Sequence, residues 1–316
     1  MKRWKGVWAV CLLWCSTAAW AQYDVEFTNY FALNGFYNPA YAGQKDRLNI
    51  YGSFALQLAG FERAPRSMCV GADMAFKGLG MRHGVGAGFF NESLGLLRNQ
   101  RFWAQYSAKV RLAGGMLGIG LQVGGLSIAF DPKDIDLGEA DNAASDPAFP
   151  TAEVSGTGLD LGAGLFYTHR YFYAGLSVNH LTAPTVRWGE SNEMSVSPTF
   201  YFTAAGNIKT KNSLLEIQPS VLLKTDGVAY KVDLTGRVLY TWHGRTYYGG
   251  LTYSPGVSVA VLLGAQLKDV SVGYAYNIFT SKIGAVSGSH DIYVNYALDL
   301  SFMGKSKNKH KSIRIL

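Results

Sequence analysis

Hydrophobic residues alternate with small or polar ones along much of this chain, most plainly in its C-terminal third. An apolar series of Val270, Val272, Tyr274, Tyr276 and Ile278 is interleaved with Ser271, Gly273, Ala275 and Asn277. The segments 289–302 and 101–112 repeat this pattern. Because successive side chains of a strand point to opposite faces, the alternation predicts β-strands with one apolar face. No helical period competes with it in these segments.

Alternation of this kind also fits a soluble sandwich, but three features favour a membrane barrel. The expected strands are about 10 residues long or longer, whereas soluble strands average about 5–6 and a tilted membrane strand needs about 9–11. Tyrosine and tryptophan lie near the ends of the apolar face, as in an interfacial girdle. The other face carries Gly, Ser, Ala and isolated charges, which suit a barrel interior. We therefore predict an all-β, single-domain transmembrane antiparallel β-barrel.

The chain divides into about fourteen such strands, and the sheet must close because backbone amides in a bilayer all need partners. We expect the strands at 47–58, 65–77, 83–92, 100–112, 116–130, 157–168, 171–179, 196–208, 213–224, 231–242, 245–253, 257–267, 269–279 and 289–302. Links after even-numbered strands are short, whereas 131–156, 180–195 and 280–288 are long. Since periplasmic turns are the short ones, both termini are expected in the periplasm, with 254–256 as the one tight outer link.

The first 21 residues have the order of a secretory signal peptide. A basic start at Lys2, Arg3 and Lys5 precedes an apolar stretch at 7–13 and a small-x-small cleavage site at Ala19-Trp20-Ala21. Lipid attachment at Cys15 is disfavoured because bulky Trp14 precedes it. In the mature chain Cys69 is then the single cysteine, which excludes an intramolecular disulfide.

Charge is concentrated at the two ends of the chain. The formal net charge of +7 falls to +4 without the three cations of the leader. The segment 304–316 contributes five more cations and no acid, which leaves the remaining body near −1. The basic balance therefore does not indicate a nucleic-acid-binding surface. We interpret 304–316 as a basic periplasmic tail that either binds an acidic partner or is solvated, the second being favoured.

The segment Asn38-Pro39-Ala40-Tyr41-Ala42-Gly43 resembles the Asn-Pro-Ala-Tyr-Ala-Gly signature of the PorP/SprF family, membrane proteins of the type IX secretion system of Bacteroidetes. Further stretches resemble the same family, in the family's order. They include Ser177 to Leu181 with Asn179 and His180, Pro219 to Lys224, and Gly288-Ser289-His290. The chain departs from the family pattern around 54–57 and at Asn277, which puts detailed partner contacts in doubt.

This resemblance implies a non-enzymatic outer-membrane component that is needed for secretion or surface attachment of sorting-domain cargo. It implies as partners the periplasmic ring proteins, an OmpA-like peptidoglycan-binding lipoprotein and the cargo, in outer-membrane lipid and without nucleic acid. We expect no catalytic residue, cofactor or metal. The alternative is an outer-membrane diffusion channel or small-molecule transporter. Trp103, Phe166 and Tyr293 face inward in the expected register, which favours a filled interior over an open one.

Residues 22–46 form a lead-in to the expected barrel of 47–303, either in the periplasm or inside the lumen. Pro39 has a fixed φ and keeps Asn38 extended. This favours a rigid plug-like or docking element, with a simple ordered lead-in as an equal alternative.

Three other patterns resemble functional sites. Asp134-x-Asp136-x-Gly138 in the loop 131–146 hints at calcium, but a solvated acidic loop is favoured because no glutamate stands at EF-hand distance. Ser289 and His290 are adjacent and so point to opposite faces of a strand, a poor geometry for a nucleophile and its base. Paired glycines at 84–88, 118–120 and 162–164 lack the strand-turn-helix context of a phosphate loop and indicate close packing.

Overall fold

The structure is a computed structural model that describes residues 24–131, 153–188, 192–280 and 287–299. The expected leader, the tail 304–316 and residues 132–152 of the acidic loop lie outside the described residues.

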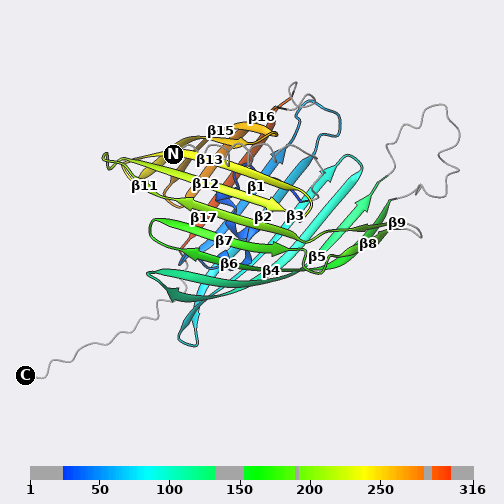
Figure 1. The fold of residues 1–316 in the computed structure, drawn as a ribbon, viewed down its shortest axis with the longest axis horizontal. Coiled ribbons are helices and arrows are strands. Elements are labelled where there is room, and N and C mark those ends of the chain that lie inside the picture. The colour runs from blue at the N-terminus through cyan, green and yellow to red at the C-terminus, as the bar shows by residue number, and fades with distance from the viewer. Residues whose placement is uncertain (1–23, 132–152, 189–191, 281–286, 300–316) are drawn as a thin grey trace, which may run out of the picture.

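Fourteen antiparallel strands close into a barrel (Figure 1). They are β1 (Leu48–Leu56), β2 (Arg66–Gly78), β3 (Met81–Leu94), β4 (Leu97–Leu112), β5 (Gly115–Phe130), β6 (Val154–Thr168), β7 (Phe172–Asn179), β10 (Thr199–Gly206), β12 (Leu215–Thr225), β13 (Tyr230–Trp242), β14 (Arg245–Ser254), β15 (Ser258–Leu267), β16 (Val270–Phe279) and β17 (Ser289–Leu298). Each has two antiparallel neighbours, because β1 pairs with β17 and β10 pairs with both β7 and β12. The predicted antiparallel barrel of about fourteen strands is confirmed.

The predicted faces of the strands are also as expected. Ile292 and Val294 on β17 are 47% and 48% exposed and point outward, whereas Tyr293 between them is 4% exposed and points inward. Trp103 and Phe166 are likewise buried inside the barrel. The outer wall is thus an apolar surface that matches a bilayer, and the inner wall contacts other protein groups.

One hairpin, on the side of the barrel where the long loops lie, was not predicted. β8 (Thr185–Trp188) and β9 (Asn192–Ser195) pair in the link between β7 and β10. Val186 and Val196 pack there against Leu126 and Ile128 of β5. Strands of four residues are too short for alternation to be visible, so this link reads as a loop in the sequence. A further short strand, β11 (Ile208–Lys209), pairs with β12 beside β10.

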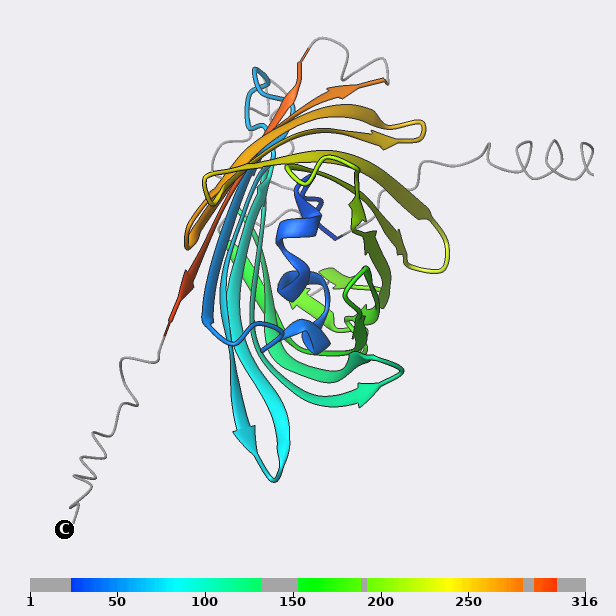
Figure 2. The same cartoon turned by 90° about the vertical axis from the view of Figure 1, so that its left-hand side faces the viewer.

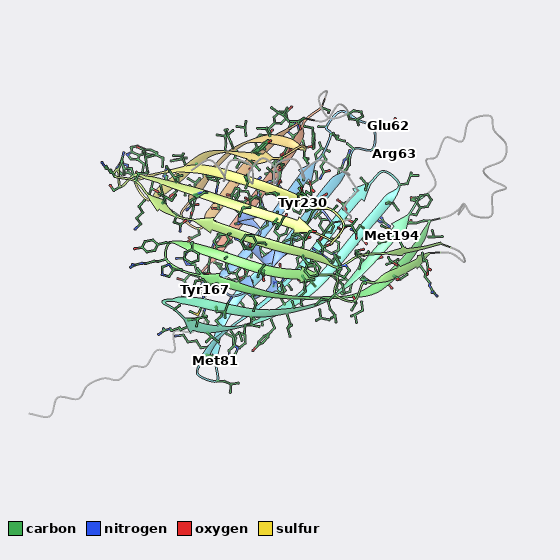
Figure 3. All side chains as sticks on the ribbon, viewed as in Figure 1. Glu62, Arg63, Met81, Tyr167, Met194 and Tyr230 are labelled. Atoms are coloured by element: carbon green, nitrogen blue, oxygen red, sulfur yellow. The ribbon has the colours of Figure 1, made fainter. Side chains whose placement is uncertain are left out.

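The links define two ends of the barrel. We call the end with links 57–65, 131–153, 180–198 and 280–288 the long-loop end, and the opposite one the short-turn end. Glu62, Arg63 and Met194 lie toward the first, and Met81 and Tyr167 toward the second (Figure 3). The expectation of one tight link at the long-loop end is wrong, because β3 and β4 are also joined there by Gly95-Leu96 alone. From Asn91 to Gln100 the leucines do not alternate regularly with the polar residues, which hides the ends of these strands in the sequence.

The segment 24–46, here called the lumenal segment, lies inside the barrel (Figure 2). It contains η1 (Tyr30–Ala32), α2 (Asn34–Tyr37) and η2 (Pro39–Tyr41). No helix in the described part of the chain is long and apolar enough to cross a membrane. Asp24 lies at the long-loop end, beside His180, whereas Leu298 pairs with Leu48 at the short-turn end. The first and last described residues of the chain therefore lie at opposite ends of the barrel, whereas the termini, which we expect in the periplasm, lie outside the described residues.

Candidate functional site: the occupied lumen

The lumenal segment runs the full height of the barrel and contacts strands on all sides of the inner wall. At the long-loop end Thr28 N donates to Asp291 of β17 at 2.5 Å. Midway, Tyr30 bonds Ser220 of β12 at 3.0 Å. At the short-turn end Gln44 donates to Thr168 of β6 at 2.8 Å. The barrel is therefore occupied by its own chain along its whole axis.

Asn38 joins the local structure of the segment to the wall. Its backbone is extended, with φ −140° and ψ 114°, and its side-chain oxygen accepts from Ala40 N at 2.9 Å. Pro39 occupies the first position of the following turn, where a missing N–H costs nothing. The amide nitrogen of Asn38 donates to Leu165 O of β6 at 2.9 Å and to Leu176 O of β7 at 3.1 Å. One side chain thus caps a turn and bridges two strands, which requires both an acceptor and a two-hydrogen donor.

Glycines of the inner wall provide the space in which the motif lies. A Cβ on Gly84 of β3 would be 1.9 Å from Ala42 O. A Cβ on Gly120 of β5 would be 2.3 Å from Ala40 N, and one on Gly164 of β6 would be 2.2 Å from the Asn38 oxygen. The paired strand glycines therefore allow the backbone of the lumenal segment to lie directly on the wall.

The carbonyls of the motif are bound by side chains of the wall. Lys109 Nζ donates to Ala40 O at 2.6 Å and Ser107 Oγ to Ala42 O at 2.7 Å. Arg82 donates to Gly43 O at 2.9 Å and to Gln44 O at 2.7 Å, while Gly43 N donates to Asp73 at 2.8 Å. Because buried backbone groups need partners, these bonds satisfy a segment that has little secondary structure of its own.

Aromatic rings fill the middle of the lumen. Phe36 contacts Phe27, Phe90 and Trp103 with centroid separations of 5.5–5.7 Å. Arg237 of β13 lies 3.5 Å above the ring of Phe31, and Arg101 of β4 lies 4.9 Å above Phe36. Rings in these geometries add to the stabilisation from burial itself.

A network of charges holds the segment at the long-loop end. Lys224 Nζ lies 3.0 Å from Glu26 and 2.9 Å from Asp24 O, and Lys231 bonds Glu26 as well. Tyr201 donates to Asp24, whose carboxylate lies 3.6 Å from His180 Nε2. The other nitrogen of His180 is 3.1 Å from Asp160.

This network fixes the charge of the segment. Burial alone would raise the pKa of Glu26, but Lys231 and Lys224 outweigh it and lower that pKa to about 2. His180, Arg101 and Lys224 likewise overcome burial and hold the pKa of Asp24 well below its usual range. Burial lowers the pKa of His180, yet Asp160 and Asp24 raise it overall. The carboxylates of Asp24 and Glu26 are therefore both ionised at neutral pH.

The other family-like residues lie away from the motif Asn38 to Gly43, toward the long-loop end. Asn179 and His180 are 1% exposed at the end of β7, whereas Leu181 is 47% exposed. At the long-loop end Gly288 O accepts from Ala59 N at 2.9 Å and Ser289 Oγ from Leu58 N at 3.0 Å. His290 bonds the hydroxyl of Tyr274 at 2.7 Å. Ser289 and His290 therefore have separate partners, and both are distant from Asn38 to Gly43.

Sequence reasoning missed the charged residues that hold the segment: Asp24, Glu26, Asp73, Arg82, Arg101, Lys109, Lys224, Lys231 and Asp291. A usable signal was present, because several are charges on the inward face of an otherwise apolar strand. The described residues contain no cluster of three or more His, Cys, Asp or Glu placed to hold a metal ion. The calcium hypothesis for Asp134 and Asp136 falls on residues outside the described ranges.

Comparison with known proteins supports the resemblance noted in the sequence. The family model described as "Type IX secretion system membrane protein PorP/SprF" matches residues 19–296. No curated protein matches the chain.

Several solved outer-membrane proteins have a similar arrangement of strands. The CymD monoaromatic hydrocarbon channel is 11% identical with a TM-score of 0.49, covering 85% of this chain and 93% of its own. The Ralstonia pickettii toluene transporter TbuX is 10% identical with a TM-score of 0.49, covering 84% and 92%. Acinetobacter baumannii Omp33 is 7% identical with a TM-score of 0.43, covering 81% and 100%. Similarity at this level carries no inference about function.

Proposed function

Because the chain belongs to the PorP/SprF family of type IX secretion system membrane proteins, we propose that it serves this system as a non-enzymatic outer-membrane subunit. In this role it is needed for secretion or surface attachment of cargo that carries a sorting domain. It acts through protein contacts with other components of the system, including periplasmic ring proteins and an OmpA-like peptidoglycan-binding lipoprotein. The apolar outer wall of the closed barrel fits the outer membrane.

The observation that carries this proposal beyond family membership is the occupied lumen. A diffusion channel needs a continuous aqueous path, whereas here Phe27, Tyr30, Leu33 and Phe36 of the lumenal segment are each at most 1% exposed. We propose that residues 22–46 are a plug and that the barrel presents binding surfaces at its two ends. The short-turn end then faces the periplasm and the long-loop end faces outward, as in other outer-membrane barrels.

Deletion of the gene in its native host tests the function. Loss of sorting-domain cargo from the cell surface, with solute uptake unchanged, is the expected result. Unchanged cargo display with reduced uptake of small solutes would support the channel alternative instead. Planar-bilayer recordings of the purified protein provide a second test, since stable conductance of a porin's size contradicts a plugged barrel.

Orientation can be tested with single cysteines. Arg63→Cys at the long-loop end and Lys209→Cys at the short-turn end are both exposed positions. The natural Cys69 is fully buried and does not compete for reagent. A membrane-impermeant maleimide applied to intact cells should label only the first variant. Labelling of only the second would reverse the assignment of the two ends.

A further inference from the structure

The short-turn end carries an excess of exposed positive charge around its whole circumference. Nearly every turn at this end contributes a cation. The exposed ones are Lys45, Arg47, Lys77, Arg111, Arg170, Lys209, Lys211, Arg245 and Lys268, which together we call the basic face. The exposed acids among the described residues there are Asp46, Asp269 and Asp299. Two of these are already paired, Asp46 with Arg82 at 2.9 Å and Asp269 with Arg47.

The long-loop end differs in its balance of charge. Among its described residues, two of the four exposed cations are each paired with an exposed acid, Arg98 with Glu153 at 2.5 Å and Arg187 with Glu193 at 3.0 Å. Of the other two, Arg63 follows directly after exposed Glu62, and Arg66 is the one cation in excess of the exposed acids. Among the described residues, the large excess of exposed positive charge is therefore at one end of the barrel.

We propose that the basic face is the docking surface for a periplasmic protein with an acidic surface. The proposal deepens the proposed function, on which its choice of compartment and partner class rests. Positive potential of this extent steers and orients an oppositely charged partner more than it determines raw affinity.

Lipid headgroups are the other anionic surface near this end, and the position of the charges argues against them as the main partner. Lys45 and Arg47 belong to the mouth of the lumen, where they line a cavity together with Asp73 and Asn295. Lipid reaches the outer wall of a barrel and not its mouth. The cations thus form a face across the end of the barrel as well as a ring around it, which is a shape that fits a protein.

The test uses a photo-reactive residue at the tip of a turn. Leu79, between β2 and β3, is 94% exposed and is replaced by p-benzoylphenylalanine in the native host. The matched position at the long-loop end is Phe61, which is 47% exposed. Illumination should join position 79 to one periplasmic protein, through a segment rich in Asp and Glu, and should give no such adduct from position 61.

Charge reversal then tests the mechanism. In the variant Arg170→Glu, Lys209→Glu, Arg245→Glu and Lys268→Glu, the adduct should fall at least about tenfold, because four attractive contacts become repulsive. The control variant Arg63→Glu, Arg66→Glu, Arg98→Glu and Arg187→Glu changes as many exposed cations at the other end and should leave the adduct unchanged. Reversing the acids of the partner's cross-linked segment should restore it.

Several outcomes overturn the proposal: adducts to lipid alone, an adduct through a neutral or basic segment, or an adduct that survives the four reversals. Cargo display, measured in the same strains, separates this inference from the proposed function. If cargo is lost in the deletion strain but the adduct survives the four charge reversals, only the docking role of the basic face is rejected. A charge-dependent adduct with cargo display intact in the deletion strain rejects only the secretion role.

Discussion

The two ends of the lumenal segment are held in different ways. Residues 38–44 lie against the wall through their backbone, with carbonyls bound by Ser107, Lys109 and Arg82 and with wall glycines beneath them. Residues 24–29 are held mainly through the carboxylates of Asp24 and Glu26. Glu26 contacts Lys224 and Lys231 of the wall, and Asp24 contacts Tyr201 and His180. The motif end therefore depends on close packing of backbone against the wall, and the long-loop end depends on charged contacts.

This difference explains which residues each end needs. A backbone that lies on a wall requires small side chains on both surfaces, and the motif has Ala40, Ala42 and Gly43 facing the wall glycines. Charged contacts tolerate changes of shape but respond to pH and salt. We therefore expect steric substitutions to act most strongly at the motif, and charge substitutions to act at the long-loop end.

The strongest test of the comparison is one methyl group at the motif wall. In Gly84→Ala the new Cβ meets Ala42 O, a backbone atom that cannot rotate away, so we expect a loss of about 2–3 kcal/mol in the free energy of unfolding. Urea-induced unfolding in lipid vesicles measures it. Gly52→Ala is the matched control, since its Cβ would be 3.6 Å from the nearest atom. Equal effects in the two variants would contradict a wall that depends on close approach.

A second test separates the two roles of Asn38. Asn38→Ala removes the cap of Ala40 N and both bonds to the strand carbonyls, and we expect a loss of about 2 kcal/mol. Asn38→Ser keeps an acceptor for the cap but cannot bridge the strands. We therefore expect it to recover about half of the free energy of unfolding that Asn38→Ala loses. The same unfolding assay reports both. If Asn38→Ser is no better than Asn38→Ala, the cap contributes nothing and the bridge alone matters.

The barrel could be predicted because its signal is local and repeated. Residues such as Ile292, Tyr293 and Val294 report their faces through their immediate neighbours in the sequence. From Asn91 to Gln100 the alternation of apolar and polar residues is interrupted, and the predicted ends of β3 and β4 are therefore too far apart. The same logic explains the hairpin of β8 and β9, whose members are too short to alternate.

The candidate site was predictable only in part. The motif residues Asn38 to Gly43 were found through the family resemblance, but nothing in the sequence placed them in the lumen rather than in the periplasm. The sequence shows inward-facing charges on the strands but not their partners, because Lys224 and Asp24 are separated by 200 positions. Closure of the barrel is what brings these partners together, and pairing across such distances is not encoded in any short window.

A third, smaller effect is expected from charge at the long-loop end. Lys231→Met removes one of the two cations that bind Glu26, whose side chain retains 37% exposure, so the loss should be limited to about 1 kcal/mol at neutral pH. The pKa of Glu26 is lowered from 4.5 to about 2. Its stabilisation is therefore complete above the unfolded value and is lost as the pH falls through about 2. Lys231→Met should raise that folded pKa and flatten the decline in stability between pH 5 and pH 2, unlike Lys268→Met at the basic face.

The smallest effect is expected where both members of an ion pair are about half exposed to water. Arg47 and Asp269 form such a pair at the short-turn end, with side chains 44% and 49% exposed. Because solvent screens both charges and the side chains lose entropy when paired, Asp269→Asn should change the free energy of unfolding by less than about 0.5 kcal/mol. Unfolding in urea at low and high salt measures this change directly, with Lys231→Met measured alongside it. A loss in Asp269→Asn as large as that in Lys231→Met would mean that the position of a charge relative to the lumen does not matter. If instead Lys231→Met lost as little stability as Asp269→Asn, the long-loop end would hold the lumenal segment through its aromatic residues Phe27 and Phe36 and not through its charged network.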